Sequence, residues 1–429
     1  MGGGGKKKNK RTKSKSKKLS GEHALASRYV NEWILHASYA SPPPPPSAAA
    51  AAAAADEFLP PEAPRVPDRV VFELHSHSKH SDGFLSPSAL VERAHRHGVK
   101  VLALTDHDTM DGIPEAMQAA LKFGMRIIPG VEISTLYSSR EIPGNGEPVH
   151  ILAYYGTCGP APYEELDILL SNIRDGRYLR AKNMLLKLNR LRMPVKWETV
   201  VKIAGEGVAP GRLHLARAMV EAGHVENLKQ AFSKYLYDGG PAYAMGSEPS
   251  AETVVQLISR TGGISALAHP WTLKNPVAVI RALKSTGLNA MEVYRSDGKV
   301  AGFSELADTH GLLKLGGSDF HGRGGQDESE LGSVGLPTAS IYEFLKLARP
   351  VWSNAMRDIL YNFAEDPSEA NLEKMLKFGV RNKLNGYSSS SCVGGDAVDL
   401  CPSSWLATHE DIELENIRLK LASNNLVIR

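Results

Sequence analysis

The segment Val70-Val71-Phe72-Glu73-Leu74-His75-Ser76-His77 decides how this chain is interpreted. A short apolar, β-branched run, which is typical of a buried strand, leads directly into two histidines. Residues two apart on a strand point to the same face, so the side chains of His75 and His77 are expected to converge. A lone His-X-His is more often an ordinary polar strand edge, so a metal site needs support from the rest of the chain.

The same kind of strand recurs along the chain. Six further apolar runs are predicted as strands, at residues 99–104, 126–133, 149–155, 263–268, 290–294 and 312–317. Most are followed by a stretch with helical periodicity, such as the one that begins at Ser86-Pro87 and ends at Gly98. Alternation of near-continuous apolar strands with helices indicates a parallel sheet covered by helices, and seven such units favour a barrel over an open sheet.

Residues of metal-ligand type follow most of these strands. They are His75, His77, Asp82, His107, Glu132, His150, His269, Asp319 and His321. The carboxyl ends of parallel barrel strands form one face, so these side chains are expected to meet there. His150 is the geometric exception, because it opens its strand. Asp106 and Asp108 are interpreted as groups that orient His107.

The composition of this set predicts its chemistry. Six imidazoles and three carboxylates, with no thiolate, suit Mn²⁺, Fe²⁺ or Zn²⁺ and argue against a structural cysteine-type zinc site. Nine ligands exceed the needs of one catalytic ion, so two or three divalent ions are expected. Neighbouring ions can hold a phosphate and lower the pKa of a shared water, which favours hydrolysis of a phosphate ester.

The motifs together resemble the PHP (polymerase and histidinol phosphatase) superfamily. They are His75-Ser-His77, Ser81-Asp82-Gly83, Thr105-Asp106-His107-Asp108, Gly130-Val131-Glu132, His150, Ala268-His269-Pro270 and Ser318-Asp319-Phe320-His321. Within it, the chain is similar to the 3′,5′-nucleotide bisphosphate phosphatase and 5′-to-3′ exoribonuclease branch. The stretches that support this branch are Arg177-X-X-Arg180-Ala181, the segment from Gly211 to Arg217 and the segment from Thr261 to Pro270.

The resemblance implies an α/β fold, a distorted (β/α)7 PHP barrel with a helical insertion between strands four and five, and a trinuclear site. His75, His77, Glu132 and Asp319 would hold one ion; Glu132 would bridge to a second, shared with His150 and His269; and Asp82, His107 and His321 would hold a third. Manganese is the first choice, with iron or zinc as alternatives. The implied catalytic residues are His75, His77, Glu132, Asp319 and His321, and a metal-bridging hydroxide would attack phosphorus.

Arg177, Arg180 and Arg212 are the candidates for binding a second phosphate or a nucleic-acid backbone. A guanidinium can donate two parallel hydrogen bonds to phosphate. The alternative is that these side chains are simply solvated, as most arginines on long helices are.

Composition divides the chain into five parts. Residues 1–69 are basic and then rich in proline and alanine, 70–159 and 246–345 are the two parts of the barrel, 160–245 are the helical insertion, and 346–429 are a helical, partly disordered extension. A short amphipathic helix is predicted over residues 22–40, and order is expected to start near Arg69.

The formal charge of +3 hides an asymmetry. Nine of the 50 basic residues lie in the first twenty positions, which leaves 41 against 47 acidic residues in the remainder. An acidic body argues against a stable DNA partner, and the lysine cluster is either a nuclear localisation signal or a solvated arm.

The sequence has no apolar run of about 18 residues, so no membrane span is expected. Three cysteines favour an intracellular setting, cytoplasmic or nuclear.

The sequence therefore predicts a metal-dependent phosphoesterase that acts on 3′,5′-bisphosphorylated nucleosides, on 5′-phosphorylated short RNA, or on both. Two alternatives stay open: a phosphatase of another small phosphomonoester, such as one like histidinol phosphate, and a non-catalytic RNA-binding or scaffold protein. The paired arginines favour the nucleotide substrate, and the full set of ligand types argues against a scaffold.

Overall fold

A computed structural model describes residues 21–35, 70–138, 146–205, 207–324, 328–366 and 368–377. Its centre is one sheet of seven strands in the order of the sequence. The strands are β1 (Val71–Glu73), β2 (Val99–Leu104), β3 (Arg126–Tyr137), β4 (Glu147–Tyr154), β5 (Ile264–Leu267), β6 (Ala290–Tyr294) and β7 (Leu313–Gly316). β1 and β7 are the sheet's two ends, and Ser76 and Phe320 form an isolated parallel bridge just beyond them. The expected α/β fold is confirmed.

The expectation of a parallel sheet is wrong for one strand. β4 runs antiparallel to both β3 and β5, while the other four strand pairs are parallel. Only nine residues separate the end of β3 from the start of β4, and parallel pairing would need a crossover of a dozen or more. The beginning of β4 therefore lies at the same edge as the carboxyl ends of its neighbours. His150, which pairs with Ser134 on β3, therefore lies at the same edge as the other ligand-type residues although it is near the start of its strand.

Five helices pack on one face of the sheet: α3 (Pro87–Arg96), α4 (Ile113–Leu121), α9 (Ala251–Arg260), α10 (Pro276–Ser285) and α11 (Ala301–His310). Their apolar residues form one core with the strands, in which Leu90, Leu102 and Val255 are fully buried. α3 begins as the sequence predicts, because the Ser86 side chain accepts a hydrogen bond from the N–H of Ala89.

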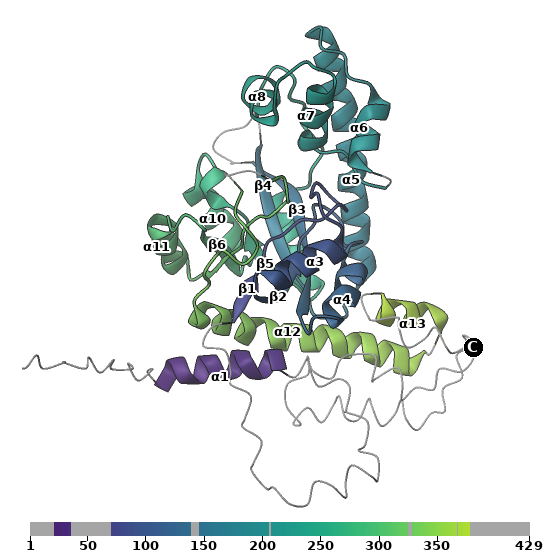
Figure 1. Cartoon of the computed structure of the whole chain (residues 1–429). Helices are drawn as coiled ribbons and strands as arrows, with labels where there is room; N and C mark the ends of the chain where they lie inside the picture. Colours follow the sequence, from purple (N-terminus) through teal and green to yellow (C-terminus); the bar gives the residue numbers. More distant parts are fainter. Residues whose placement is uncertain are drawn as a thin grey trace, which may run out of the picture.

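The insertion between β4 and β5 is helical, as expected. It contains α5 (Tyr163–Arg190), α6 (Trp197–Ala204), α7 (Arg212–Glu221), α8 (Leu228–Ala231) and a π-helical turn at Phe232–Leu236. α6, α7 and the second half of α5 share a separate core that includes Leu188, Val200 and Met219. The first half of α5 instead packs into the sheet's core through Leu170. One continuous helix thus fixes the insertion above the strand ends (Figure 1).

The other face of the sheet packs against α12 (Thr338–Glu365), which is followed by α13 (Glu369–Leu376). The helix predicted at 22–40 is present as α1 (Gly21–Leu35), and its last predicted residues lie outside the described ranges. α1 and α12 run side by side at the end of the sheet away from the insertion (Figure 1). Among the described residues, no helix has the length and apolarity needed to cross a membrane.

The expectation that order starts near Arg69 is wrong, because α1 belongs to the core. Trp33 is 1% exposed, stacks on Phe72 with ring centroids 6.3 Å apart, and lies under the Arg126 guanidinium at 4.1 Å. Tyr29 packs edge-on against Tyr342 of α12. The buried residues Ala26, Val30 and Trp33 have helical spacing, which predicts an apolar helix face but not what that face packs against. The sequence therefore does not reveal that this helix joins the sheet's second core.

Replacing Trp33 by alanine should lower the free energy of unfolding by about 3–5 kcal/mol, because a large buried ring is removed from a packed core. Chemical denaturation monitored by circular dichroism measures this loss. The matched control is Leu25→Ala on the same helix, where the side chain is 61% exposed and the change should be small. Equal, small effects of both substitutions would show that α1 does not contribute to the core.

Candidate metal centre

All nine ligand-type residues named from the sequence lie together at the strand edge below the insertion. Their ligand atoms form three overlapping groups in which all atoms lie within 4.8 Å of one another. The groups are His77, Asp82, His107 and His321; His75, His77, Glu132 and Asp319; and His107, Glu132 and His150. His269 joins them through its Nε2, which lies 2.9 Å from Glu132 Oε1. His80 belongs to none of the three groups.

Glu132 occupies the middle of the cluster. Its side chain is 1% exposed, and its two oxygens face five imidazoles. Oε2 lies 3.1 Å from His75 Nε2, 3.2 Å from His77 Nε2 and 3.3 Å from His107 Nδ1, while Oε1 lies 2.9 Å from both His150 Nδ1 and His269 Nε2. One carboxylate can therefore contact ligands of two different ions.

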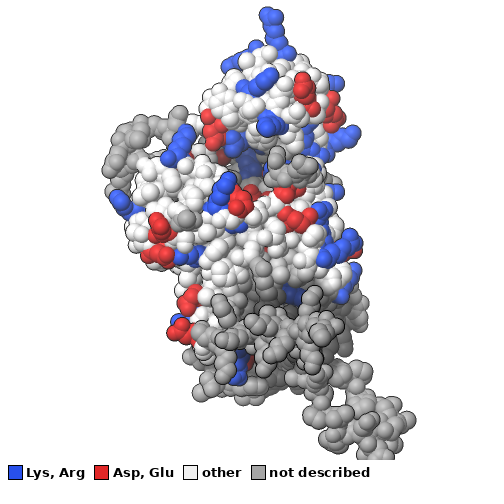
Figure 2. All heavy atoms as spheres, turned by 60° about the vertical axis from the view of Figure 1, so that its left-hand side comes forward, with Lys and Arg blue, Asp and Glu red and all other residues white. Residues whose placement is uncertain are grey.

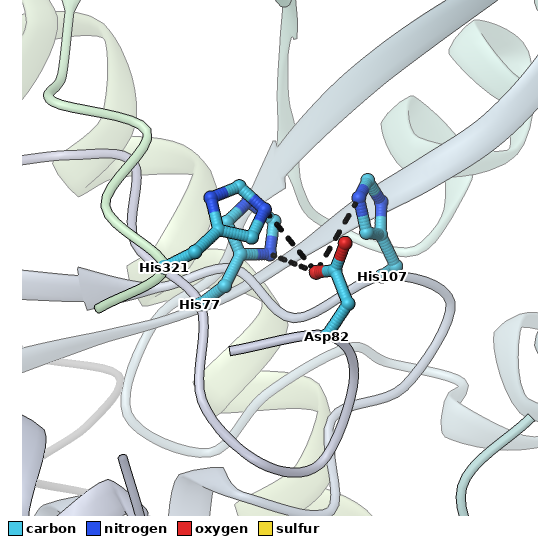
Figure 3. Close-up of side chains that lie close together, drawn as sticks. All are labelled: His77, Asp82, His107 and His321. Atoms are coloured by element: carbon cyan, nitrogen blue, oxygen red, sulfur yellow. Dashed lines mark ion pairs between the residues drawn. The ribbon is translucent and has the colours of Figure 1, made fainter. Parts of the chain in front are cut away.

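The two aspartates lie on either side of this centre. Asp82 Oδ1 is 3.2 Å from His321 Nε2, 3.9 Å from His107 Nε2 and 4.0 Å from His77 Nδ1, so three rings point toward one oxygen (Figure 3). Asp319 Oδ1 is 3.3 Å from His75 Nε2 and 3.2 Å from His77 Nε2, and its side chain is 42% exposed. Asp319 is thus the most accessible carboxylate of the three.

Sharp turns after the strands aim several of these side chains. Asp108, His269 and Asp319 have φ of 55°, 29° and 53°, three of the four positive-φ residues other than glycine in the described structure. Side chains rarely adopt this left-handed region, and such strain concentrates at functional sites where surrounding contacts hold it. Here the peptide N–H of Asp319 is held by the carbonyl of His75, and that of Asp108 by the carbonyl of Glu132.

Electrostatic pairing inside the cluster shifts its pKa values in opposite directions. Burial raises the pKa of Glu132, but the surrounding histidines outweigh it and hold this pKa well below its usual range. For His77, burial lowers the pKa, and the neighbouring carboxylates of Asp319 and Glu132 outweigh this and raise it to about 10. His107 goes the other way, because burial dominates and lowers its pKa. The carboxylates are therefore ionised at neutral pH, and some histidines must release protons when a cation binds.

The residues fit divalent metal ions. Both ring nitrogens of His77, Oδ1 of Asp82 and Nδ1 of His107 are buried and make no hydrogen bond within the described structure. Buried polar atoms are otherwise nearly always hydrogen-bonded, so four such atoms in one cluster point to a ligand that satisfies them. Imidazole and carboxylate donors are those that Mn²⁺, Fe²⁺ and Zn²⁺ accept.

Two buried carboxylates of the site have no counterpart among the residues singled out from the sequence. Glu292 on β6 is 1% exposed and contacts His75 Nδ1 at 3.1 Å. Glu73 on β1 is equally buried and accepts hydrogen bonds from the N–H groups of His75, Ser318 and Gly332. The one available signal was an acidic residue inside an otherwise apolar strand.

The interpretation of Asp106 and Asp108 is wrong. Asp106 accepts hydrogen bonds from the N–H and hydroxyl of Ser78 and the hydroxyl of Ser81, and so fixes the loop that carries Asp82. Asp108 accepts from the N–H and hydroxyl of Ser134 and from Arg177 Nε. Asp106 therefore stabilises a loop, Asp108 joins β3 to α5, and neither side chain is bonded to the His107 ring.

The three arginines named from the sequence line one pocket with Asp82, His107 and His150. Each is anchored: Arg177 Nη2 donates to Ser134 at 2.6 Å, Arg180 Nη1 to Glu248 at 3.0 Å and Arg212 Nη1 to Asp238 at 2.6 Å. Their side chains are 15%, 17% and 30% exposed, so the simple solvated alternative is wrong. Figure 2 shows basic side chains gathered where the insertion meets the body of the molecule.

Solved structures place this arrangement among known enzymes. A structure described as a putative metal-dependent phosphoesterase from Bifidobacterium adolescentis matches with a TM-score of 0.56 and 28% identity, over 66% of this chain and 97% of that chain. A structure of an amidohydrolase from Chromobacterium violaceum with bound sulfate matches with a TM-score of 0.57 and 29% identity, over 64% and 96%. The fold and the cluster define a hydrolase, a metal-dependent phosphoesterase.

Sequence comparison identifies the family. The PHP domain model matches residues 73–199. The 3′,5′-nucleoside bisphosphate phosphatase of Chromobacterium violaceum is 31% identical over 298 residues, which is 67% of this chain and 97% of that relative. The 5′-3′ exoribonuclease Rnm of Salmonella typhimurium is 33% identical over 262 residues, 59% of this chain and 85% of that relative. The chain belongs to the PHP family.

One further histidine lies beside the pocket without joining the cluster. His214 of α7 is 2% exposed, and its Nδ1 accepts a hydrogen bond from the N–H of Gly211 at 3.0 Å. Burial lowers the pKa of His214 to about 4. The folded protein therefore keeps this ring neutral at a pH where the unfolded chain protonates it, and stability present above pH 6.5 is lost as the pH falls toward 4.

His214→Asn should remove this part of the acid sensitivity, because an asparagine oxygen can still accept from Gly211 but does not titrate. Between about pH 7 and pH 5, the metal-free wild type should lose about 2 kcal/mol more unfolding free energy than the variant. Urea denaturation at the two pH values measures both losses. Identical pH dependence in the two proteins would contradict a buried, neutral His214.

Proposed function

We propose that this protein hydrolyses phosphate esters of 3′,5′-bisphosphorylated nucleosides and of short 5′-phosphorylated RNA. The observation that carries the proposal is a single pocket that has the histidine–carboxylate cluster on one wall and anchored arginines on another. Such a pocket offers one place for the phosphate that reacts and a second for a phosphate that is only bound. A substrate with two phosphates uses both.

The nine ligand-type residues would hold two or three divalent ions, with manganese as the first choice. When bound, such ions supply a hydroxide at neutral pH and neutralise charge on the phosphate. Two of the chain's own carboxylates have separate roles in such a site. Glu132 is ionised and connects the histidine groups, and Asp319, the exposed carboxylate, lies where the cluster meets solvent.

The arginines are suited to bind the second phosphate because they are already held in place. Asp108 and Ser134 fix Nε and Nη2 of Arg177, which leaves Nη1 near Gly211, where a side chain's Cβ would lie 3.3 Å from it. A glycine at position 211 therefore keeps the approach to Nη1 open. A pre-oriented guanidinium loses less side-chain entropy on binding phosphate than a free one.

The names of the relatives support the choice of substrate class. One is a 3′,5′-nucleoside bisphosphate phosphatase and another a 5′-3′ exoribonuclease, and both substrates carry a phosphate ester next to a second phosphate group. A phosphatase for a small monoester is less favoured, since a single phosphate leaves the arginine wall unused. A non-catalytic scaffold is disfavoured by a complete ligand set. An intracellular location, cytoplasmic or nuclear, suits these substrates.

The test is release of phosphate from a 3′,5′-bisphosphorylated nucleoside, and of mononucleotides from 5′-phosphorylated oligoribonucleotides, with added Mn²⁺. Wild type should turn over at least one substrate, and Asp319→Ala should reduce kcat about 100-fold or more, since even indirect loss of ligand support costs 10–100-fold. The fold should survive, because the Asp319 side chain is 42% exposed.

The matched control is Asp308→Ala, which removes a carboxylate that is 69% exposed and pairs with Lys314 on the surface. It should leave kcat unchanged. No turnover of either substrate by manganese-loaded wild type would refute the proposed function. Unchanged turnover in Asp319→Ala would refute the assigned site.

Arg212→Gln should raise KM for a 3′,5′-bisphosphate about 10–100-fold, since a hydrogen bond to a charged group contributes about 1.5–3 kcal/mol. Hydrolysis of p-nitrophenyl phosphate, which has no second phosphate, should change little. Steady-state kinetics on both substrates measures the split. Arg190→Gln, at the exposed end of α5, is the control and should affect neither. An equal loss on both substrates would mean that Arg212 does not bind the second phosphate.

A further inference from the structure

Glu292 makes two different contacts to the metal centre although β6 supplies none of the nine ligands. Its Oε1 lies 3.1 Å from His75 Nδ1, and its Oε2 accepts a hydrogen bond from the backbone N–H of His269 at 2.6 Å. The residue is 1% exposed. One buried carboxylate thus joins the histidine that follows β1 to the histidine that follows β5.

We propose that Glu292 is a positioning residue that holds the His75 ring and the His269 backbone in the orientation needed to bind metal. The inference rests on the metal centre of the proposed function but not on the choice of substrate. It assigns Glu292 a role in metal affinity, distinct from a role in holding the fold together.

For His75, the argument concerns which ring nitrogen carries the proton. An ionised carboxylate only accepts hydrogen bonds, so His75 Nδ1 must carry the hydrogen that faces Glu292. In a neutral imidazole the other nitrogen then has the free lone pair. That nitrogen, Nε2, lies 3.1 Å from Glu132 and 3.3 Å from Asp319, which is where a shared ion would be held. Carboxylates that bond to the far nitrogen commonly orient metal-binding histidines in this way.

For His269, Glu292 contacts the backbone, and the backbone conformation then sets the position of the ring. The residue has φ of 29° and ψ of 58°, a conformation that side chains rarely adopt. Its N–H is directed to Glu292, and its ring is then placed with Nε2 at 2.9 Å from Glu132 Oε1. The rings of His75 and His269 lie 6.0 Å apart at 23°, so the two contacts of Glu292 place two rings side by side.

Glu73 provides a contrast within the same site. It is also 1% exposed and also adjoins His75, but it accepts hydrogen bonds from the backbone N–H groups of His75, Ser318 and Gly332. Glu73 therefore holds loop backbone together and does not touch an imidazole ring. Its Oε1 accepts from His75 and Ser318, whereas its Oε2 accepts from Gly332. A glutamine here can keep both contacts beside the ligands and lose only the one to Gly332, so it should lower stability more than metal affinity.

The test is Glu292→Gln, which keeps the size of the side chain but has one acceptor oxygen for two donors. If that oxygen serves the N–H of His269, the amide NH₂ faces His75 Nδ1, which must then accept, and the hydrogen moves to Nε2, the nitrogen that should bind metal. Affinity for Mn²⁺ should fall about 10–100-fold. Titration of metal-free protein with Mn²⁺, with free ion followed by electron paramagnetic resonance, measures this without any substrate.

Glu73→Gln is the matched control, and thermal unfolding is measured for both variants. The inference predicts that Glu292→Gln loses Mn²⁺ affinity with little change in melting temperature, and that Glu73→Gln melts earlier with Mn²⁺ affinity close to wild type. Wild-type Mn²⁺ affinity in Glu292→Gln would overturn the inference, as would parallel losses of affinity in both variants. Failure of the nucleotide assays alone would leave this result standing, because no substrate is used.

Discussion

The structure depends on a buried negative charge that must be paired. Glu132 is placed in the middle of the sheet edge, where an isolated carboxylate would be very costly to desolvate. Five imidazoles surround it. Asp82 pairs with His321 on one side, and Asp319 shares the Nε2 atoms of His75 and His77 with Glu132 on the other. The charges of the carboxylates and the rings stabilise each other in the folded chain, and the same pairing prepares the cluster to exchange protons for cations.

The fold brings this charge and its partners together from distant parts of the sequence. The antiparallel direction of β4 puts His150 at the same edge as the ends of β3 and β5, and left-handed turns aim His269 and Asp319 inward. α5 then connects the sheet's core to the core of the insertion, so Arg177 and Arg180 are held over the cluster by a continuous helix. The result is one pocket that contains two kinds of group suited to phosphate, the histidine–carboxylate cluster and the arginines.

Much of this could be predicted from the sequence because the signals are local. Most of the ligands follow or begin an apolar strand, and the spacing from His75 to His77 fixes a shared face. Glu292 could not be assigned in this way, since its partner His75 is 217 residues away and an acid within an apolar strand does not indicate its partner. The direction of β4 depends on a short connection rather than on composition. The placement of α1 against the sheet depends on the packing of Trp33 on Phe72. Non-local packing decided the cases of Glu292 and α1.

The number of metal ions bound by each chain tests the central claim most directly, because it depends on the cluster alone. Purified protein would be loaded with Mn²⁺, desalted, and measured by inductively coupled plasma mass spectrometry against protein concentration. The overlapping ligand groups around Glu132 predict two or three ions per chain. Fewer than two ions in a folded, full-length chain would contradict the claim that these nine side chains form a single polynuclear centre.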